Sequence, residues 1–137
     1  YGEFYARAMY LYGNRDVRDW NPDLIVPVPV HRTKLRMRGF NQAAFLAEKL
    51  GNYTGIPVSQ ELVLKMRKTK SQKKLTAVQR RKNLEEAFLV NGEVNGKRIL
   101  VVDDVYTTGS TVDAMASCLK KKGASAVYFL TVCIGRI

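Results

Sequence analysis

The feature that most constrains the fold is an apolar run that ends in two adjacent acids. Residues 99–102 read Ile-Leu-Val-Val, and Asp103 and Asp104 follow directly. Four consecutive apolar residues predict a strand that is covered on both faces, as in parallel sheets. A loop of small hydroxyl residues, a helical pattern at 109–122 and a second apolar strand at 126–133 come next. Strand, helix and strand in this order predict a βαβ unit and an α/β fold with a mostly parallel central sheet.

The remaining patterns fit a single domain over residues 1–137. We expect strands at 24–26, 56–58, 62–64 and 87–90, and helices at 1–11, at 41–50 and after Thr76. Gly51 is expected to end the second of these helices. Because the chain begins with Tyr1 rather than Met, we expect a fragment, or the C-terminal part of a longer chain.

The two acids and the loop after them form a candidate ligand site. Asp103 and Asp104 follow a predicted parallel strand, and ligands of α/β sheets bind beyond the carboxyl ends of strands. The backbone amides of residues 107–111 open a helix, where they suit a phosphate. Carboxylates beside a phosphate would repel it unless they bind sugar hydroxyls and a divalent cation. The alternative is a strand end with ordinary capping residues, which requires neither two acids nor four hydroxyl residues around one glycine.

The charge favours anionic partners. The chain carries a net charge of +11, and residues 65–82 hold nine Lys or Arg and no acid. A solvated basic surface is the simpler alternative. Proteins that bind single-stranded DNA interleave aromatic residues with basic ones, and this stretch contains no aromatic residue.

The cysteines and the apolar runs indicate in which cellular compartment the protein is expected. Cys118, Cys133 and the single His31 do not make a Cys/His zinc site, so we expect free thiols and a reducing cytoplasm. No apolar run is long enough to span a membrane, so membrane insertion is not expected.

Residues 99–111 resemble the motif that binds 5-phosphoribosyl-1-pyrophosphate (PRPP) in type I phosphoribosyltransferases. Tyr106 departs from the motif, which usually has an aliphatic residue there. The resemblance implies the type I phosphoribosyltransferase fold with a flexible lid loop. It also implies that Asp103 and Asp104 are the catalytic pair, binding the ribose hydroxyls and, through the ribose, Mg2+. The 5′-phosphate loop would consist of Thr107, Thr108, Gly109, Ser110 and Thr111.

A more specific resemblance is to the ComF family of phosphoribosyltransferase-like competence proteins. It rests on Pro27–Arg32 with Arg38-Gly39-Phe40-Asn41-Gln42, on residues 69–88, and on the PRPP segment. It implies a pyrophosphate loop at Val30, His31 and Arg32, and a lid loop that contains Lys68, Thr69, Lys70 and Gln72. Family members commonly carry an N-terminal four-cysteine zinc module, which this sequence lacks.

The implied reaction is Mg2+-dependent displacement of pyrophosphate at ribose C1 of PRPP by an unknown nucleophile. Thr107 stands where purine-salvage enzymes of the hypoxanthine–guanine type carry an Asp, which argues against that acceptor class. Two alternatives remain open. The protein could bind PRPP without catalysis, or it could be a DNA-uptake accessory protein that binds single-stranded DNA or a helicase partner.

Overall fold

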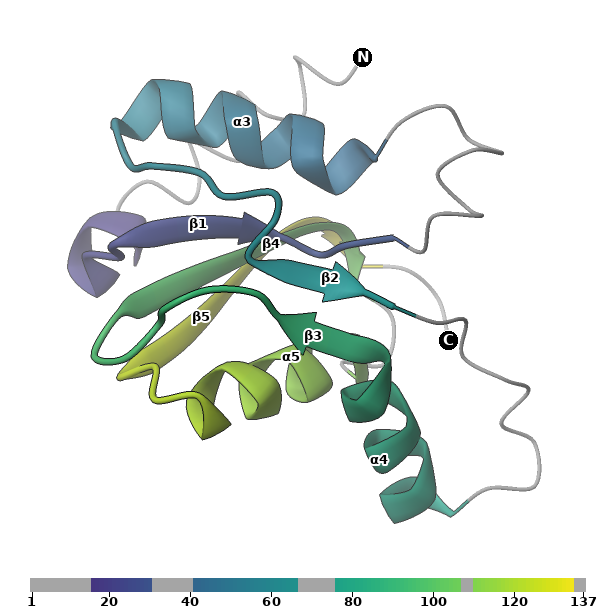
Figure 1. Cartoon of the computed structure of the whole chain (residues 1–137). Coiled ribbons are helices and arrows are strands. Elements are labelled where there is room, and N and C mark those ends of the chain that lie inside the picture. Colours follow the sequence, from purple (N-terminus) through teal and green to yellow (C-terminus); the bar gives the residue numbers. More distant parts are fainter. Residues whose placement is uncertain (1–15, 31–40, 67–75, 107–109, 135–137) are drawn as a thin grey trace.

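The computed structural model describes residues 16–30, 41–66, 76–106 and 110–134 (Figure 1). Residues 16–20 are helical. The elements that follow are β1 (Leu24–Pro27), α3 (Gln42–Thr54), β2 (Val63–Lys65), α4 (Ala77–Ala87), β3 (Phe88–Val90), β4 (Arg98–Tyr106), α5 (Ser110–Lys121) and β5 (Ala126–Ile134). The helix expected at residues 1–11 lies outside the described residues.

The main sheet has three parallel strands in the order β1-β4-β5. Ile25 of β1 lies opposite Leu100 of β4, and Val101 lies opposite Phe129 of β5. Figure 1 shows α3 on one face of this sheet and α5 on the other. The predicted α/β fold, with a parallel central sheet flanked by helices, is therefore confirmed.

Alternating side chains of β4 supply the cores of both faces, as the pleat of a strand requires. Ile99 and Val101 belong to the cluster that includes Met115 of α5. Leu100 and Val102 belong to the cluster that includes Leu50 of α3. All four β4 residues are fully buried, which is why the run is apolar without alternation.

A second layer is built from the antiparallel pair β2–β3 and from α4. Leu64 lies opposite Leu89 in this two-stranded ribbon. Helix α4 follows Thr76, as expected, and begins with a capping box: Thr76 Oγ1 accepts from Gln79 N at 3.1 Å, and Thr76 N donates to Gln79 Oε1 at 2.9 Å. Leu84 and Phe88 bury themselves in the α5-side cluster, so this layer packs against the α5 side of the sheet.

Gly51 does not end α3, contrary to the sequence expectation. The helix continues to Thr54, and Gly55 ends it with φ 78 and an N–H bond to Gly51 O. A Cβ at position 51 would lie 2.5 Å from Val58 Cγ2 and 3.0 Å from Ile56 O. Gly51 therefore allows the segment with Ile56 and Val58, which follows the helix, to pack closely against it. It does not form a turn.

Other element bounds also differ from expectation. Residues 56–58 form only a single parallel bridge, Val58 to Ile25, and not a strand. Ala87 closes α4 instead of opening β3. Strand β4 continues through both acids to Tyr106, because β5 pairs with it as far as Ile134. In the described part of the chain, no helix is long and apolar enough to cross a bilayer.

Candidate functional site

The chain leaves β1 and β4 toward opposite faces of the sheet. Strand β1 leads to α3, whereas β4 leads to α5 on the other face (Figure 1). Neighbouring parallel strands whose connections diverge in this way open a crevice beyond their carboxyl ends, where α/β proteins bind ligands. By this rule, the crevice expected between the ends of β1 and β4 is the candidate ligand site.

Asp103 and Asp104 lie at this crevice. In the described residues, the ladder between β1 and β4 ends at Pro27 and Val102, with one more bond from Val28 N to Val102 O at 2.9 Å. The two acids come directly after, on a strand held only on its β5 side, where Asp103 lies opposite Thr131. Both acids are half-buried. They are thus on a fixed backbone and within reach of a ligand.

The two carboxylates belong to different faces of β4. Successive side chains of a strand alternate, so Asp103 follows Val101 toward α5 and Asp104 follows Val102 toward α3. Asp103 Oδ1 also accepts a hydrogen bond from Asp104 N at 2.8 Å, which orients its carboxylate. A single ligand can meet both acids only by lying across the carboxyl edge of the sheet.

The amino end of α5, the next element after β4, is a candidate anion site. The helix begins at Ser110, and Thr111 is half-buried in its first turn. The first amides of a helix have no partner within the helix and attract phosphate. Of the expected phosphate loop, Thr107, Thr108 and Gly109 lie outside the described residues.

Other expected site residues are only partly described. Val30 is half-buried, two residues after Val28 at the end of β1. His31 and Arg32, and the expected lid residues Lys68, Thr69, Lys70 and Gln72, lie outside the described residues. The expected site residues that the structure describes are Val30, Asp103, Asp104, Ser110 and Thr111.

Asn41 has no role that the sequence predicted at the site, yet its side chain links α3 to the end of β1. Asn41 Oδ1 accepts from Ala44 N at 3.3 Å and caps α3, while Asn41 Nδ2 donates to Val28 O at 3.2 Å. The cap could have been predicted from an Asn that directly precedes an apolar helix pattern. The bond to Val28 spans 13 residues and has no sequence signal.

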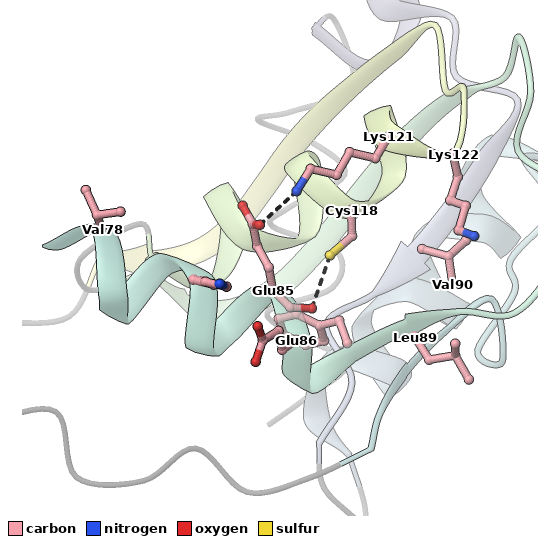
Figure 2. Close-up of a pocket in the computed structure, with 10 residues that line it drawn as sticks. Val78, Glu85, Glu86, Leu89, Val90, Cys118, Lys121 and Lys122 are labelled. Carbon is pink, nitrogen blue, oxygen red and sulfur yellow. Dashed lines mark hydrogen bonds and ion pairs between the residues drawn. The ribbon is translucent and has the colours of Figure 1, made fainter. Parts of the chain in front are cut away.

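A separate groove of about 550 Å³ lies between α4, β3 and the end of α5 (Figure 2). Its lining includes Val78, Lys82, Glu85, Glu86, Phe88, Leu89, Val90, Cys118, Lys121 and Lys122. None of the candidate site residues lines it. The described residues hold no group of three or more His, Cys, Asp or Glu that could bind a metal, here or at the acids.

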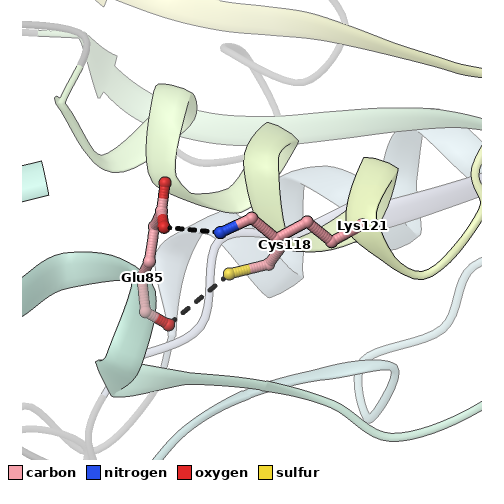
Figure 3. A network of polar contacts seen from close by, with 3 residues as sticks. All are labelled: Glu85, Cys118 and Lys121. Carbon is pink, nitrogen blue, oxygen red and sulfur yellow. Dashed lines mark hydrogen bonds and ion pairs between the residues drawn. The ribbon is translucent and has the colours of Figure 1, made fainter. Parts of the chain in front are cut away.

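Glu85 joins the two helices beside that groove (Figure 3). Its carboxylate accepts from Lys121 Nζ at 3.0 Å, and its backbone carbonyl accepts from Cys118 Sγ at 3.5 Å. Burial, and secondly the charge of Glu85, raise the pKa of the Cys118 thiol, while Lys121 acts in the opposite direction. Cys118 is a free thiol, as expected, and its raised pKa lowers the fraction of the reactive thiolate at a given pH.

Comparison with known proteins identifies the fold and the family. Residues 6–136 match the model of the phosphoribosyl transferase domain. The chain is 39% identical over 112 residues to the DNA utilization protein YhgH of Escherichia coli, covering 82% of this chain and 49% of that protein. It is 35% identical over 129 residues to Competence protein F of Haemophilus influenzae, covering 89% of this chain and 56% of that protein.

A solved structure has the same fold. The purine phosphoribosyltransferase of Pyrococcus horikoshii superposes with a TM-score of 0.59 at 18% identity, over 92% of this chain and 70% of that one. At this identity the likeness concerns the fold alone. The chain spans about half the length of the curated relatives it matches.

Proposed function

Because the chain belongs to the phosphoribosyl transferase domain family, and to its ComF group, we propose that it binds PRPP and transfers the phosphoribosyl group to an acceptor. One observation carries the proposal. Asp103 and Asp104 lie on β4 beyond its ladder with β1, and α5 begins at Ser110, four residues after Tyr106 ends this strand. This arrangement offers hydroxyl acceptors and a phosphate site one beside the other, which matches a ribose 5-phosphate.

In the proposed reaction the acceptor's lone pair forms a bond to ribose C1 as the bond from C1 to the pyrophosphate oxygen breaks. The pyrophosphate leaves with the electron pair. Asp103 and Asp104 accept hydrogen bonds from the ribose hydroxyls and hold C1 in place. The segment from Thr107 to Thr111 binds the 5′-phosphate at the helix amino end. The protein thus acts chiefly through positioning and charge complementarity.

The leaving group carries most of the negative charge. We assign its neutralisation to the backbone and side chains of Val30, His31 and Arg32, and to the lid residues Lys68, Thr69, Lys70 and Gln72. Closure of such a lid would exclude water and so protect C1 from hydrolysis. The chain's net charge of +11 is consistent with an anionic substrate.

The residues at the site fit a magnesium ion that arrives with the substrate. The described residues offer two adjacent carboxylates there and no cage of three or more ligands. Mg2+ is usually held by one or two carboxylates and by substrate phosphates, while it keeps several waters. When bound, it would neutralise charge on the departing pyrophosphate.

Calorimetric titration with PRPP and Mg2+ tests the proposal. Asp103→Asn and Asp104→Asn should each weaken binding about 10- to 100-fold, because hydrogen bonds to a charged acceptor are lost. Asp23→Asn is a matched control. Asp23 Oδ2 accepts from Arg98 N at the opposite end of β4, and an amide oxygen can replace it. Absence of PRPP binding by the unaltered chain, or equal binding by all variants, would contradict the proposal.

The relatives support a second candidate function. They are called a DNA utilization protein and a competence protein, and residues 65–82 are strongly basic. We propose as the alternative that the protein assists DNA uptake in the cytoplasm by binding single-stranded DNA or a helicase partner, without catalysis. It predicts DNA affinity that falls steeply with salt, survives Asp103→Asn, and is lost on removal of Lys and Arg from residues 65–82.

A further inference from the structure

Asn41 uses both ends of its amide to hold two segments that are far apart in the sequence. It precedes α3 with an extended backbone, φ −97 and ψ 112. Its oxygen accepts from Ala44 N at 3.3 Å and its nitrogen donates to Val28 O at 3.2 Å. The two partners fix the orientation of the amide, because a backbone N–H needs an oxygen and a carbonyl needs an N–H.

Val28 connects Asn41 to β4, the strand that carries the two acids. Its own N–H donates to Val102 O at 2.9 Å, one residue before Asp103. Val28 is 8% exposed and Val102 is fully buried. A continuous path of hydrogen bonds therefore runs from the first turn of α3, through Asn41 and Val28, to the residue next to Asp103. Shielding from water makes such bonds more effective than exposed ones.

The end of β1 has little else to hold it at this point. Among the described residues, its ladder with β4 stops at Pro27, and Pro29 has no N–H to donate. Val28 lies between these two prolines, at the crevice where the chain must stay close to β4. The amide of Asn41 supplies a donor that keeps the backbone in place there.

We propose that Asn41 is a positioning residue for the phosphosugar site: it holds the end of β1 against β4 and so sets the width of the crevice beside Asp103 and Asp104. The inference rests on the proposed function, since it assigns the crevice to PRPP. Asn41 acts through Val28 and does not need to touch the ligand.

A helix cap alone would not require asparagine at this position. Serine, threonine or aspartate can also accept from the third residue of a helix. Aspartate offers no donor, and the hydroxyl of serine or threonine ends one bond nearer the backbone than the asparagine Nδ2, so only asparagine combines the cap with a donor that extends to Val28 O. Asn41→Ser therefore keeps the cap, adds no charge and removes only the bond to Val28, whereas Asn41→Ala removes both.

The test measures PRPP affinity by calorimetry with Mg2+, together with thermal unfolding, for the unaltered chain, Asn41→Ser and Asn41→Ala. Asn41→Ser should weaken PRPP binding about 5- to 10-fold, the effect of one shielded hydrogen bond, with little change in unfolding temperature. Asn41→Ala should show the same loss of affinity and also a lower unfolding temperature. Equal PRPP affinity of Asn41→Ser and the unaltered chain would overturn the inference and leave Asn41 a cap.

Amide hydrogen exchange at Val28 separates this inference from the proposed function. Asn41→Ser should accelerate exchange of the Val28 amide, whose bond to Val102 it loosens, and should leave the Leu100 amide unchanged. If the unaltered chain binds PRPP and the Val28 amide is unaffected by Asn41→Ser, the inference alone fails. If the unaltered chain does not bind PRPP, the proposed function fails and the role of Asn41 in substrate binding fails with it.

Discussion

The parallel sheet and the layer made of β2, β3 and α4 differ in how far they enclose their side chains. Ile25 and Leu100 in the sheet are fully buried between α3 and α5. In the second layer, Val78 is 77% exposed, Met66 59% and Leu89 44%. The sheet is covered on both faces, whereas the ribbon and α4 are covered on one.

This difference assigns separate tasks to the two regions. The candidate site residues Asp103 and Asp104 directly follow the fully buried residues 99–102 of the same strand, so the best-packed part of β4 leads into them. The second layer contributes no described residue to that site. Regions with fewer buried apolar contacts open at lower free energy. The contrast therefore separates a well-packed sheet, which carries the candidate site, from a more open layer beside it, and four predictions test this difference.

The same substitution in the two regions should give the largest contrast. Leu100→Ala leaves a cavity in a fully enclosed core and should lower the free energy of unfolding by about 3 to 5 kcal/mol. Leu89→Ala, on the open face of the ribbon, should lower it by less than about 1 kcal/mol. Chemical denaturation of both variants measures the difference. Comparable losses would show that the ribbon is as well packed as the sheet.

The next largest change in the free energy of unfolding is expected at Gly51, where α3 packs closely against the segment that contains Val58. Helix propensity alone predicts that Gly51→Ala stabilises α3 by about 1 kcal/mol. Because the new Cβ would lie 2.5 Å from Val58 Cγ2, we expect instead a loss of about 1 to 2 kcal/mol.

A second substitution serves as the control for this contact. Val58→Ala removes the atom that the added methyl group would meet, so the double variant should recover most of the loss relative to Val58→Ala alone. The free energies of unfolding of all four proteins form a double-mutant cycle. A gain in stability from Gly51→Ala alone would contradict the close approach.

The enclosed elements were the ones that the sequence could predict. Residues 99–102 are apolar without alternation because both faces of β4 are covered, and that pattern indicates a buried parallel strand. The helices expected at 41–50 and after Thr76 follow from local patterns, and α3 and α4 begin at Gln42 and Ala77. The two acids after the apolar run marked the candidate site, although β4 continues through them to Tyr106.

What could not be predicted depends on residues brought together by the fold. Arg98 Nε donates to Trp20 O at 2.7 Å, and Trp20 stacks on Tyr128 with ring centroids 4.9 Å apart. The hydrogen bond joins residues that are 78 positions apart in the sequence, at the amino end of the sheet. Gly51 was misread because a glycine that permits close approach and a glycine that ends a helix look the same in one sequence. The bond from Asn41 to Val28 was missed for the same kind of reason.

The capping box should contribute to the stability of α4, because few other contacts define where this helix begins. Val78 in its first turn is exposed, and the buried residues of α4, Leu84 and Ala87, lie near its end. Thr76→Ala removes the acceptor for Gln79 N and should cost about 1 kcal/mol, most of it visible as faster hydrogen exchange in α4. Thr76→Ser, which keeps the hydroxyl, should resemble the unaltered chain. Unchanged exchange in Thr76→Ala would mean that packing on α5 alone fixes the helix.

The smallest effect is expected at Cys118, where α5 contacts α4. The direction in which stability changes with pH follows from the raised pKa of its thiol. Burial and the Glu85 carboxylate disfavour the thiolate in the folded state, so the thiol loses its proton at higher pH there than in the unfolded chain. The stability that the neutral thiol provides is therefore complete below the pKa of the unfolded thiol and falls as the pH rises through the higher folded pKa. Iodoacetamide should modify Cys118 more slowly in the folded chain than in denaturant at the same alkaline pH, when modification is followed for the peptide that contains Cys118.

Glu85→Gln removes a negative charge near the sulfur and should accelerate the reaction, while Lys121→Met removes the opposing positive charge and should slow it. Both variants also lose the ion pair between Glu85 and Lys121, whose lysine is 69% exposed, so equal rates in the two would show that α4 opens away from α5 before the thiol reacts. That result would place the weak point of the molecule between the two layers, whereas opposite shifts would show that they stay joined while the thiol reacts.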